Sequence, residues 1–292
     1  PRLSQVTSAN AYIGARPVAE ALDGGALIVL CGRVTDTALA LGPLVHEFGW
    51  AADDWDRLAA GTICGHILEC GAQATGGNFT RWWEVPELWK VGYPIAEVEA
   101  SGSFVVTKHP GTGGMVTVDT VSEQLVYEMG DPKSYITPDV IADFTSIRLA
   151  QEGVDRVRVS GIAGRAKTPF LKISASYLDG YKAAGQVTVS GPRAIEKARL
   201  AAEIVWKRLE RAGVTFAEDD RVTELLGVSA VLPGILAAPS DPPEVVLRLA
   251  VRDADRGKVD RFGKEIAPLV TAGPPGVTGF AGGRPKAQEV VA

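Results

Sequence analysis

Three side chains that can take part in proton transfer or nucleophilic chemistry lie close together in the sequence: His66, Glu69 and Cys70. On a helix, His66 and Cys70 would share one face, with Glu69 beside them. A histidine and a carboxylate within reach of each other are the groups from which general acid/base pairs are built. We therefore expect His66 and Glu69 to be catalytic. The alternative is that His66 caps a helix or makes a structural hydrogen bond.

Cys70 is a candidate nucleophile, but its expected position weakens that role. A reactive thiolate needs a nearby cation or a helix amino terminus, whereas Cys70 would lie near a helix carboxyl end. The alternative is that it packs as a small core residue. A metal site is also the weaker option, because zinc sites usually collect three or four ligands and the chain has only three histidines. We expect neither a metal nor a separate cofactor.

The stretch ATGGNF follows these residues and can bring backbone amides close to a ligand. We expect Gly76, Gly77 and Asn78 to contact substrate through backbone donors and the asparagine amide. The alternative is a helix carboxyl cap followed by a loop.

A second glycine loop, KHPGTGG at 108–114, has a lysine and a histidine before its glycines, a combination suited to cradling a phosphate or an oxyanion. A hairpin turn is the alternative, and neither a P-loop nor a GxGxxG spacing is present. We expect His109 to move protons, and the substrate-binding residues to include Lys108, Gly111, Gly113 and Gly114.

Two arginines are expected to hold anionic groups. Arg33 lies in CGRVTD at 31–36, directly after an apolar run, with Asp36 at the expected start of a helix. Arg284 lies in the glycine- and proline-rich stretch 273–285. For CGRVTD, the alternative is a plain strand-to-helix loop with a surface arginine and a capping aspartate.

The elements that must position these residues suggest two regions. In region 1–150, a helix at 15–25 precedes the continuous apolar run ALIVLCG at 26–32, and helical periodicity then returns. A further helix is expected at 53–70. This order predicts an α/β fold with a mostly parallel sheet and flanking helices. Aromatic residues gather at 81–93, where they can form a lid, a pocket wall or an oligomer interface.

Region 151–292 is expected to be a smaller α+β unit with an antiparallel sheet. Alternating strands are expected at 155–161, 169–177, 185–191 and 244–253, the second and third joined by a turn at Asp179 and Gly180. A long helix should run from Pro192 to Arg211, and a last helix should lie within 255–270. The glycine-rich stretch after it predicts a shaped loop or a flexible tail.

Composition excludes several classes of partner. A net charge of −5 without basic runs gives no general attraction to nucleic acid, and no apolar run approaches the roughly 20 residues of a membrane span. Three scattered cysteines favour a reducing compartment, so we expect a cytoplasmic protein. Because Pro1 is not an initiator methionine, we expect additional sequence before it.

Several long stretches resemble the acyclic terpene utilisation protein A family: GRVTDTALALGPLVHEFGW, GHILECGAQATGGNF, KHPGTGGMVTVDTVSEQLVYE, DPKSYITPDV, GIAGR and KEIAPLVTAGPPGVTGFAGGRP. The resemblance runs through essentially the whole chain. It implies an amino-terminal α/β segment before Pro1 and a place in bacterial breakdown of citronellol and geraniol through branched acyl-CoA intermediates. It supplies no catalytic residues.

Together these observations predict an enzyme that acts on a branched or terpenoid acyl-CoA, or a related carboxylate, by hydration, dehydration or isomerisation. Coenzyme A would enter as part of the substrate. The three glycine-rich loops are expected to converge on His66. Two alternatives stay open: a non-catalytic subunit or scaffold of an acyl-CoA-processing complex, and a thioester or amide hydrolase. A homo-oligomer is expected, with a partner subunit as a further option.

Overall fold

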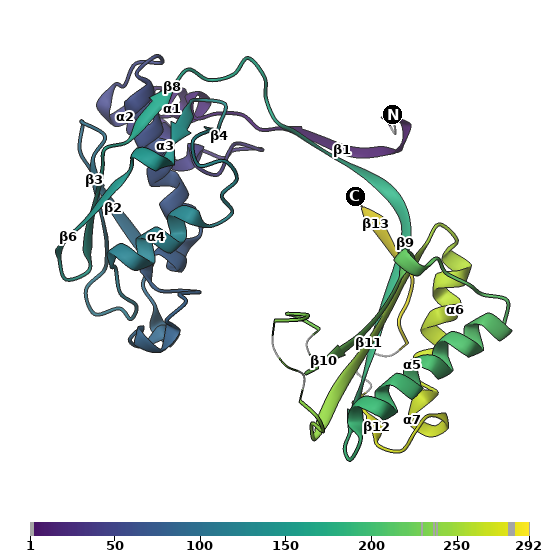
Figure 1. Ribbon diagram of the computed structural model, residues 1–292. Coiled ribbons are helices and arrows are strands. Elements are labelled where there is room, and N and C mark those ends of the chain that lie inside the picture. The colour runs from purple at the N-terminus through teal and green to yellow at the C-terminus, as the bar shows by residue number, and fades with distance from the viewer. Residues whose placement is uncertain (1–2, 229, 236, 238, 280–283, 292) are drawn as a thin grey trace. The chain divides into compact units, whose positions relative to one another are not determined.

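The chain forms two compact units in the computed structural model, which describes residues 3–228, 230–235, 237, 239–279 and 284–291. One unit comprises Ala9–Ser174, and the other comprises Pro1–Ser8 with Ala175–Ala292. Strands β1 (Val6–Ala11) and β9 (Ile173–Ser190) both run through the boundary between them (Figure 1).

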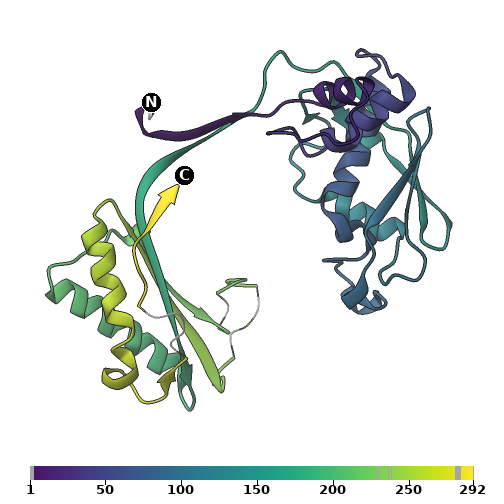
Figure 2. The same ribbon diagram turned by 180° about the vertical axis from the view of Figure 1, so that it is seen from behind.

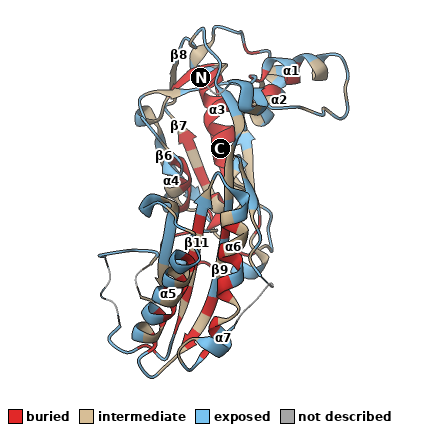
Figure 3. Cartoon of the chain, turned by 90° about the vertical axis from the view of Figure 1, so that its right-hand side faces the viewer, coloured by how far each residue is buried: buried red, intermediate tan, exposed pale blue. Residues whose placement is uncertain are grey.

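Helix α3 (Trp55–Glu69) is the central element of the first unit (Figure 3), and every residue from Leu58 to Ile67 is buried. Its glycines allow close packing: a Cβ on Gly65 would lie 2.6 Å from the backbone oxygen of Thr37. Helices α1 (Arg16–Asp23) and α2 (Ala38–Phe48) precede it, and α4 (Val118–Val126) begins at a capping box of Thr117 and Thr120.

Two antiparallel sheets complete this unit. The first has the order β2 (Pro94–Val98), β3 (Phe104–Lys108), β7 (Arg156–Ser160), β6 (Arg148–Gly153), and the second has the order β4 (Tyr135–Ile136), β5 (Ile141–Asp143), β8 (Ala163–Arg165). Inward residues of β3 and β7, such as Phe104 and Val157, pack with α3 in one hydrophobic core. Short 3₁₀ turns connect the elements: η2 (Gly71–Thr75), η3 (Trp82–Glu84), η4 (Leu88–Lys90) and η5 (Phe144–Ser146).

The prediction of a mostly parallel sheet is wrong. Every strand pair whose register is described is antiparallel, and the parallel pairing among the described residues is limited to two isolated bridges, Ile13 with Val34 and Val91 with Gly113. The apolar run at 26–30 forms no strand, and Leu27 and Leu30 are 99% and 97% exposed. A continuous apolar run forms a buried strand only where neighbouring strands pair with it. No described strand pairs with residues 26–30.

The second unit is a sheet covered by helices. The order is β1, β9, β11 (Glu244–Asp253), β10 (Arg221–Leu226), and the short strands β12 (Val277–Thr278) and β13 (Gln288–Val291) also pair with β9. Helices α5 (Ala194–Arg211) and α6 (Arg256–Ile266) lie on the same side of this sheet (Figure 2), followed by α7 (Leu269–Ala272). The remaining short turns are η1 (Leu3–Gln5) and η6 (Glu218–Asp220).

The core of the second unit lies between its sheet and its helices. Val187 of β9 and Leu247 of β11 are register partners, and both are buried in one cluster with Val205 of α5 and Phe262 of α6. The predicted strand pair with a turn at Asp179 and Gly180 is instead the single strand β9. Gly180, with φ +91°, lets that strand continue through the expected turn.

Candidate functional site

His66 lies inside the core of the first unit and is hydrogen-bonded at both ring nitrogens. Its side chain is 3% exposed; Nδ1 is 2.9 Å from Glu69 Oε1 and Nε2 is 3.0 Å from the backbone oxygen of Gln124. The Gln124 side-chain amide in turn donates to the His66 carbonyl at 2.7 Å. This reciprocal pair joins α3 to α4 and fixes the orientation of the imidazole.

The partners of His66 constrain its tautomer. A backbone carbonyl only accepts hydrogen bonds, so the contact with Gln124 requires Nε2 to be the donor. The Nδ1 contact faces Glu69, whose side chain is 22% exposed, so the pair links the buried imidazole to the molecular surface.

A pocket of about 540 Å³ opens on the carboxylate side of this pair. It lies between the start of α2, the end of α3 and the residues that follow α4, and its lining is Asp36, Leu39, Ala40, Gly65, Leu68, Glu69, Cys70 and Glu128. Three residues predicted from the sequence therefore meet here: Asp36, Glu69 and Cys70. Leu39, Ala40 and Leu68 give the pocket an apolar wall.

The pocket is strongly acidic. Asp36, Glu69 and Glu128 bring three carboxylates to it, and the residues described for its lining include no lysine or arginine. Arg33 pairs with Asp36 at 3.5 Å and lies over the Tyr12 ring at 5.1 Å, so it is next to the lining residues. The pocket therefore suits a ligand group that is neutral, or that gains positive charge during a reaction, better than a multiply charged anion.

Tyr135 faces the same acidic groups, with its ring centroid 5.6 Å from that of His66. Burial, followed by the negative charges of Glu69 and Asp36, raises the pKa of Tyr135 to about 12. Its phenol therefore keeps its proton at neutral pH and can act as a hydrogen-bond donor. The Phe144 ring also packs against the imidazole in an edge-to-face arrangement, with ring centroids 5.4 Å apart.

Cys70 lines the pocket as the carboxyl-terminal cap of α3 and is only partly buried. A reactive thiolate needs a nearby cation or a helix amino terminus, and the described lining of the pocket offers Cys70 neither. Cys64 lies earlier on α3 and is a core residue, and burial raises the pKa of its thiol to about 12. Neither thiol is therefore in an environment that favours a nucleophile.

Gly76, Gly77 and Asn78 end the short helix η2. The Gly76 amide donates to the carbonyl of Gln73 at 3.2 Å and the Gly77 amide to that of Ala72 at 2.8 Å, so both serve as caps. Gly76 has φ +105° and Asn78 has φ +57°, the left-handed region that glycine and asparagine adopt most readily. Asn78 is exposed, and the described lining of the pocket includes none of the three.

The loop at 108–114 is held by contacts within the protein. Lys108 is 3.2 Å from Asp155 Oδ2 and donates to the Thr112 carbonyl at 3.1 Å, and its side chain is only 6% exposed. The amides of Gly113 and Gly114 donate to the carbonyls of Lys90 and Pro86. These glycines permit close chain packing, since a Cβ on Gly113 would lie 2.1 Å from the oxygen of Glu87.

Two more predicted residues of this unit, His109 and Gly111, are not among the residues that line the pocket. His109 is exposed, and Gly111, with φ +77°, has open space around it. The two glycine loops do meet, because the Met115 amide donates to the Thr75 carbonyl at 2.9 Å. Arg284 belongs to the other unit, and residues 280–283 before it lie outside the described residues, so its approach to His66 stays a prediction.

Sequence reasoning missed three residues of this site: Gln124, Glu128 and Tyr135. Each is distant from His66 in the sequence, and no local spacing connects them to it. Glu128 has φ +52°, a conformation that non-glycine residues adopt rarely and that is found more often at functional sites. In the described part of the chain, no three His, Cys, Asp or Glu residues are grouped to hold a metal ion.

Comparison with known proteins assigns the family. The model of the acyclic terpene utilisation family protein AtuA matches residues 2–292. The chain belongs to the AtuA family. This confirms the resemblance drawn from the sequence and connects the chain with acyclic terpene utilisation. No curated protein and no solved structure matches it. Among the described residues, no helix is both long and apolar enough to cross a bilayer.

Proposed function

We propose that this AtuA-family chain catalyses proton transfer on a branched or terpenoid acyl-CoA, or a related carboxylate, so that water is added or removed or a double bond is moved. The supporting observation is the pair formed by His66 and Glu69. A buried imidazole is hydrogen-bonded to a carboxylate that lines an acidic pocket with an apolar wall. Such a pair can deliver a proton to a substrate and receive it back.

Glu69 is the catalytic acid and base in this proposal, and His66 is a positioning residue that holds the carboxyl group by a hydrogen bond. For hydration, the Glu69 carboxyl gives its proton to one carbon of a double bond, and water bonds to the other carbon. The proton that this water loses returns to the Glu69 carboxylate, which restores the starting state. The net reaction adds one water molecule to the substrate, and dehydration is the reverse reaction.

The charge of the pocket supports this chemistry. Protonation of a branched double bond places positive charge on carbon, and Asp36 and Glu128 are fixed carboxylates that favour such charge. The same carboxylates repel phosphates, so only the neutral acyl part would enter. We assign Arg33, which is 45% exposed, to the anionic end of the substrate. Three free cysteines favour a reducing compartment, and we place the reaction in the cytoplasm.

The experiment is a product search by mass spectrometry with the purified protein. Branched unsaturated acyl-CoA esters, their saturated analogues and the free acids are each incubated with the wild type and with Glu69→Gln. We expect the wild type to convert unsaturated substrates to a product heavier by one water, or to an isomer. Glu69→Gln should form neither product. If no substrate of the set changes, the proposal loses its support.

A second candidate is a non-catalytic subunit of an acyl-CoA-processing complex. It is favoured by exposed aromatic residues: Trp82, Trp83 and Trp89 are 64%, 65% and 83% exposed. Several exposed apolar side chains close together in the sequence are typical of a surface that binds another protein, including a second copy of the chain. Co-purification of a partner, with pathway flux unchanged in a His66→Ala, Glu69→Ala double variant, would favour this role. Sedimentation of the purified chain would detect a homo-oligomer.

A further inference from the structure

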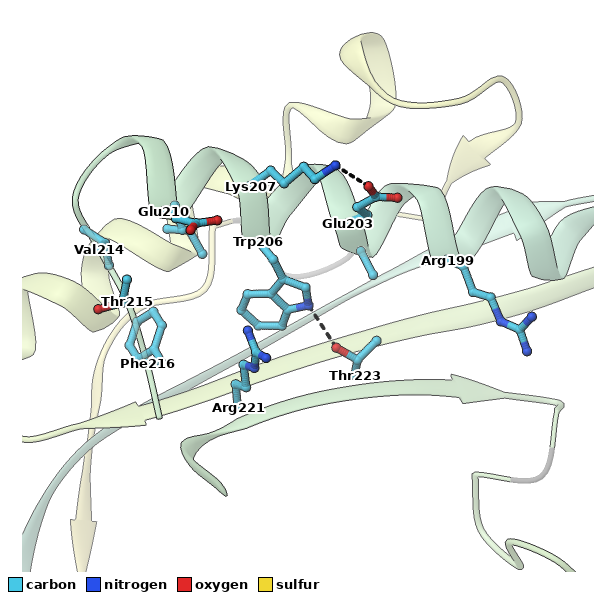
Figure 4. Close-up of a pocket in the computed structure, with 12 residues that line it drawn as sticks. Arg199, Glu203, Trp206, Lys207, Glu210, Val214, Thr215, Phe216, Arg221 and Thr223 are labelled. Atoms are coloured by element: carbon cyan, nitrogen blue, oxygen red, sulfur yellow. Dashed lines mark hydrogen bonds and ion pairs between the residues drawn. The ribbon is translucent and has the colours of Figure 1, made fainter. Parts of the chain in front are cut away.

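A second cavity of about 540 Å³ lies in the unit that contains β9, β10 and β11. It is bounded by α5, by the segment at 214–216 and by β10 (Figure 4). Its apolar surface includes Trp206, Val214 and Phe216, and its polar surface includes Arg199 and Arg221. This combination of an apolar wall with a few charged groups is typical of small-molecule sites.

The Trp206 indole is held in one orientation by three neighbours. The Phe262 ring stacks with it at 6.0 Å and 20°. Its Nε1 donates to Thr223 Oγ1 at 3.0 Å, and the Arg221 guanidinium lies 5.8 Å from the ring (Figure 4). The aromatic wall is therefore formed before any ligand arrives, which lowers the entropic cost of binding.

Two arginines of the cavity are available to an anionic ligand. Lys207 is paired with Glu203 at 2.5 Å, whereas no carboxylate of the described residues forms an ion pair with Arg199 or Arg221. An arginine in that position, next to an aromatic wall, can form a bidentate pair with a ligand carboxylate.

We propose that this cavity binds a small monocarboxylate with an apolar chain. The chain lies against Trp206 and Phe216, and the carboxylate pairs with Arg221 or Arg199. Glu203 and Glu210 also line the cavity, and their charges oppose ligands with several negative charges, such as nucleotides. This site is independent of the proposed function, because it shares no residue with the pocket at Glu69.

Octanoate, octanol and adenosine triphosphate are the probes, measured by calorimetry and by the indole N–H resonances of the protein. The Trp206 resonance is identified as the one absent from Trp206→Phe. We expect octanoate to bind with a Kd below about 1 mM and to shift this resonance. Octanol and adenosine triphosphate are expected to bind at least about tenfold more weakly.

Variants locate the carboxylate. Arg221→Gln and Arg199→Gln are each compared with Arg211→Gln, an exposed arginine of α5 that is not among the residues that line the cavity. At least one of the first two should weaken octanoate binding about tenfold or more, while Arg211→Gln should bind as the wild type. Unchanged circular dichroism verifies the fold of each variant.

Four results would overturn the proposal. The first is that octanoate does not bind, and the second is that octanoate binds without shifting the Trp206 resonance. The third is that octanol or adenosine triphosphate binds as tightly as octanoate, which would remove the preference for a single carboxylate. The fourth is that all three arginine variants bind octanoate equally well.

Discussion

The imidazole of His66 is 2.9 Å from the carboxylate of Glu69 and belongs to the core, whereas Glu69 belongs to the pocket. The pair therefore connects a buried hydrogen-bond network, through Gln124, with a pocket at the molecular surface.

Replacing Glu69 by glutamine should abolish proton transfer without unfolding the protein. Glutamine keeps the shape of the side chain but cannot carry the proton, and removal of a general acid or base typically costs about 10²–10⁴-fold in rate. Turnover and thermal stability are measured together. The matched control is Glu20→Gln in the exposed pair with Arg16, which should keep full activity. Equal activity of both variants would contradict the role of Glu69.

The tautomer of His66 can be observed directly by nitrogen NMR. Because its Nε2 faces a carbonyl, we expect the tautomer in which Nε2 carries the proton. In Glu69→Gln, the Nδ1 resonance should change while the Nε2 resonance persists. A neutral ring protonated only at Nδ1 would show that the contact with Gln124 is wrong.

Tyr135 should ionise only above the pH at which a free tyrosine ionises, and it should make the protein less stable in alkali. Its pKa in the folded chain is about 12, above the ordinary value of about 10, so the folded state retains a proton that the unfolded state has lost. The stability is fully present below about pH 10, and falls as the pH rises through about 12. Relative to Tyr135→Phe, the wild type should lose up to about 2 kcal/mol in this window. Urea unfolding and tyrosinate absorbance measure both effects, and an equal loss in the two proteins would contradict the burial of the phenol.

Lys108 should contribute to stability more than to substrate affinity. Its ammonium pairs with Asp155 and holds the Thr112 carbonyl, so Lys108→Met leaves a partly buried carboxylate without its partner. We expect a loss of about 1–3 kcal/mol, at the lower end because Asp155 is 29% exposed. Lys90→Met, in a more exposed pair with Glu87, is the control. A large rise in KM with unchanged stability would instead assign Lys108 to the substrate.

Gly65→Ala should disturb the contact of α3 with the start of α2. The added Cβ would lie 2.6 Å from the Thr37 oxygen, so the backbone must shift, at a cost of about 1–3 kcal/mol. Gly32→Ala introduces a Cβ into open space and should be nearly neutral. Chemical denaturation compares the two, and equal stabilities would contradict the close packing at Gly65.

Local patterns predicted the elements of the second unit best. The alternating pattern at 244–253 coincides with β11, and the helical spacing that ends at Arg211 coincides with the end of α5. These segments have one buried and one exposed face, so their periodicity records the packing. The predicted turn within β9 failed because β11 pairs with β9 from Tyr181 to Ser190, and tertiary pairing outweighs turn chemistry at Gly180.

The apolar run at 26–30 could not show whether a parallel sheet forms. Such a run favours burial, but it does not specify which strands would lie beside it. The site was predictable only where it is local. Glu69 follows His66 by three residues on one helix, so their contact follows from helix geometry. Gln124 is 58 residues away, and only the folded chain brings it to His66. For the glycine loops, the sequence could not distinguish two uses of the backbone amides. A glycine whose amide caps a helix and a glycine whose amide binds a ligand occur in the same sequence patterns.

The most direct measurement of the central claim is deuterium uptake from heavy water into a branched unsaturated acyl-CoA, followed by mass spectrometry. Proton transfer through Glu69 predicts that the wild type introduces deuterium at a carbon of the acyl chain and that Glu69→Gln does so about a hundredfold more slowly or not at all. If the wild type introduces no deuterium, or if Glu69→Gln introduces it as fast as the wild type, the acid/base role of the His66 and Glu69 pair is contradicted.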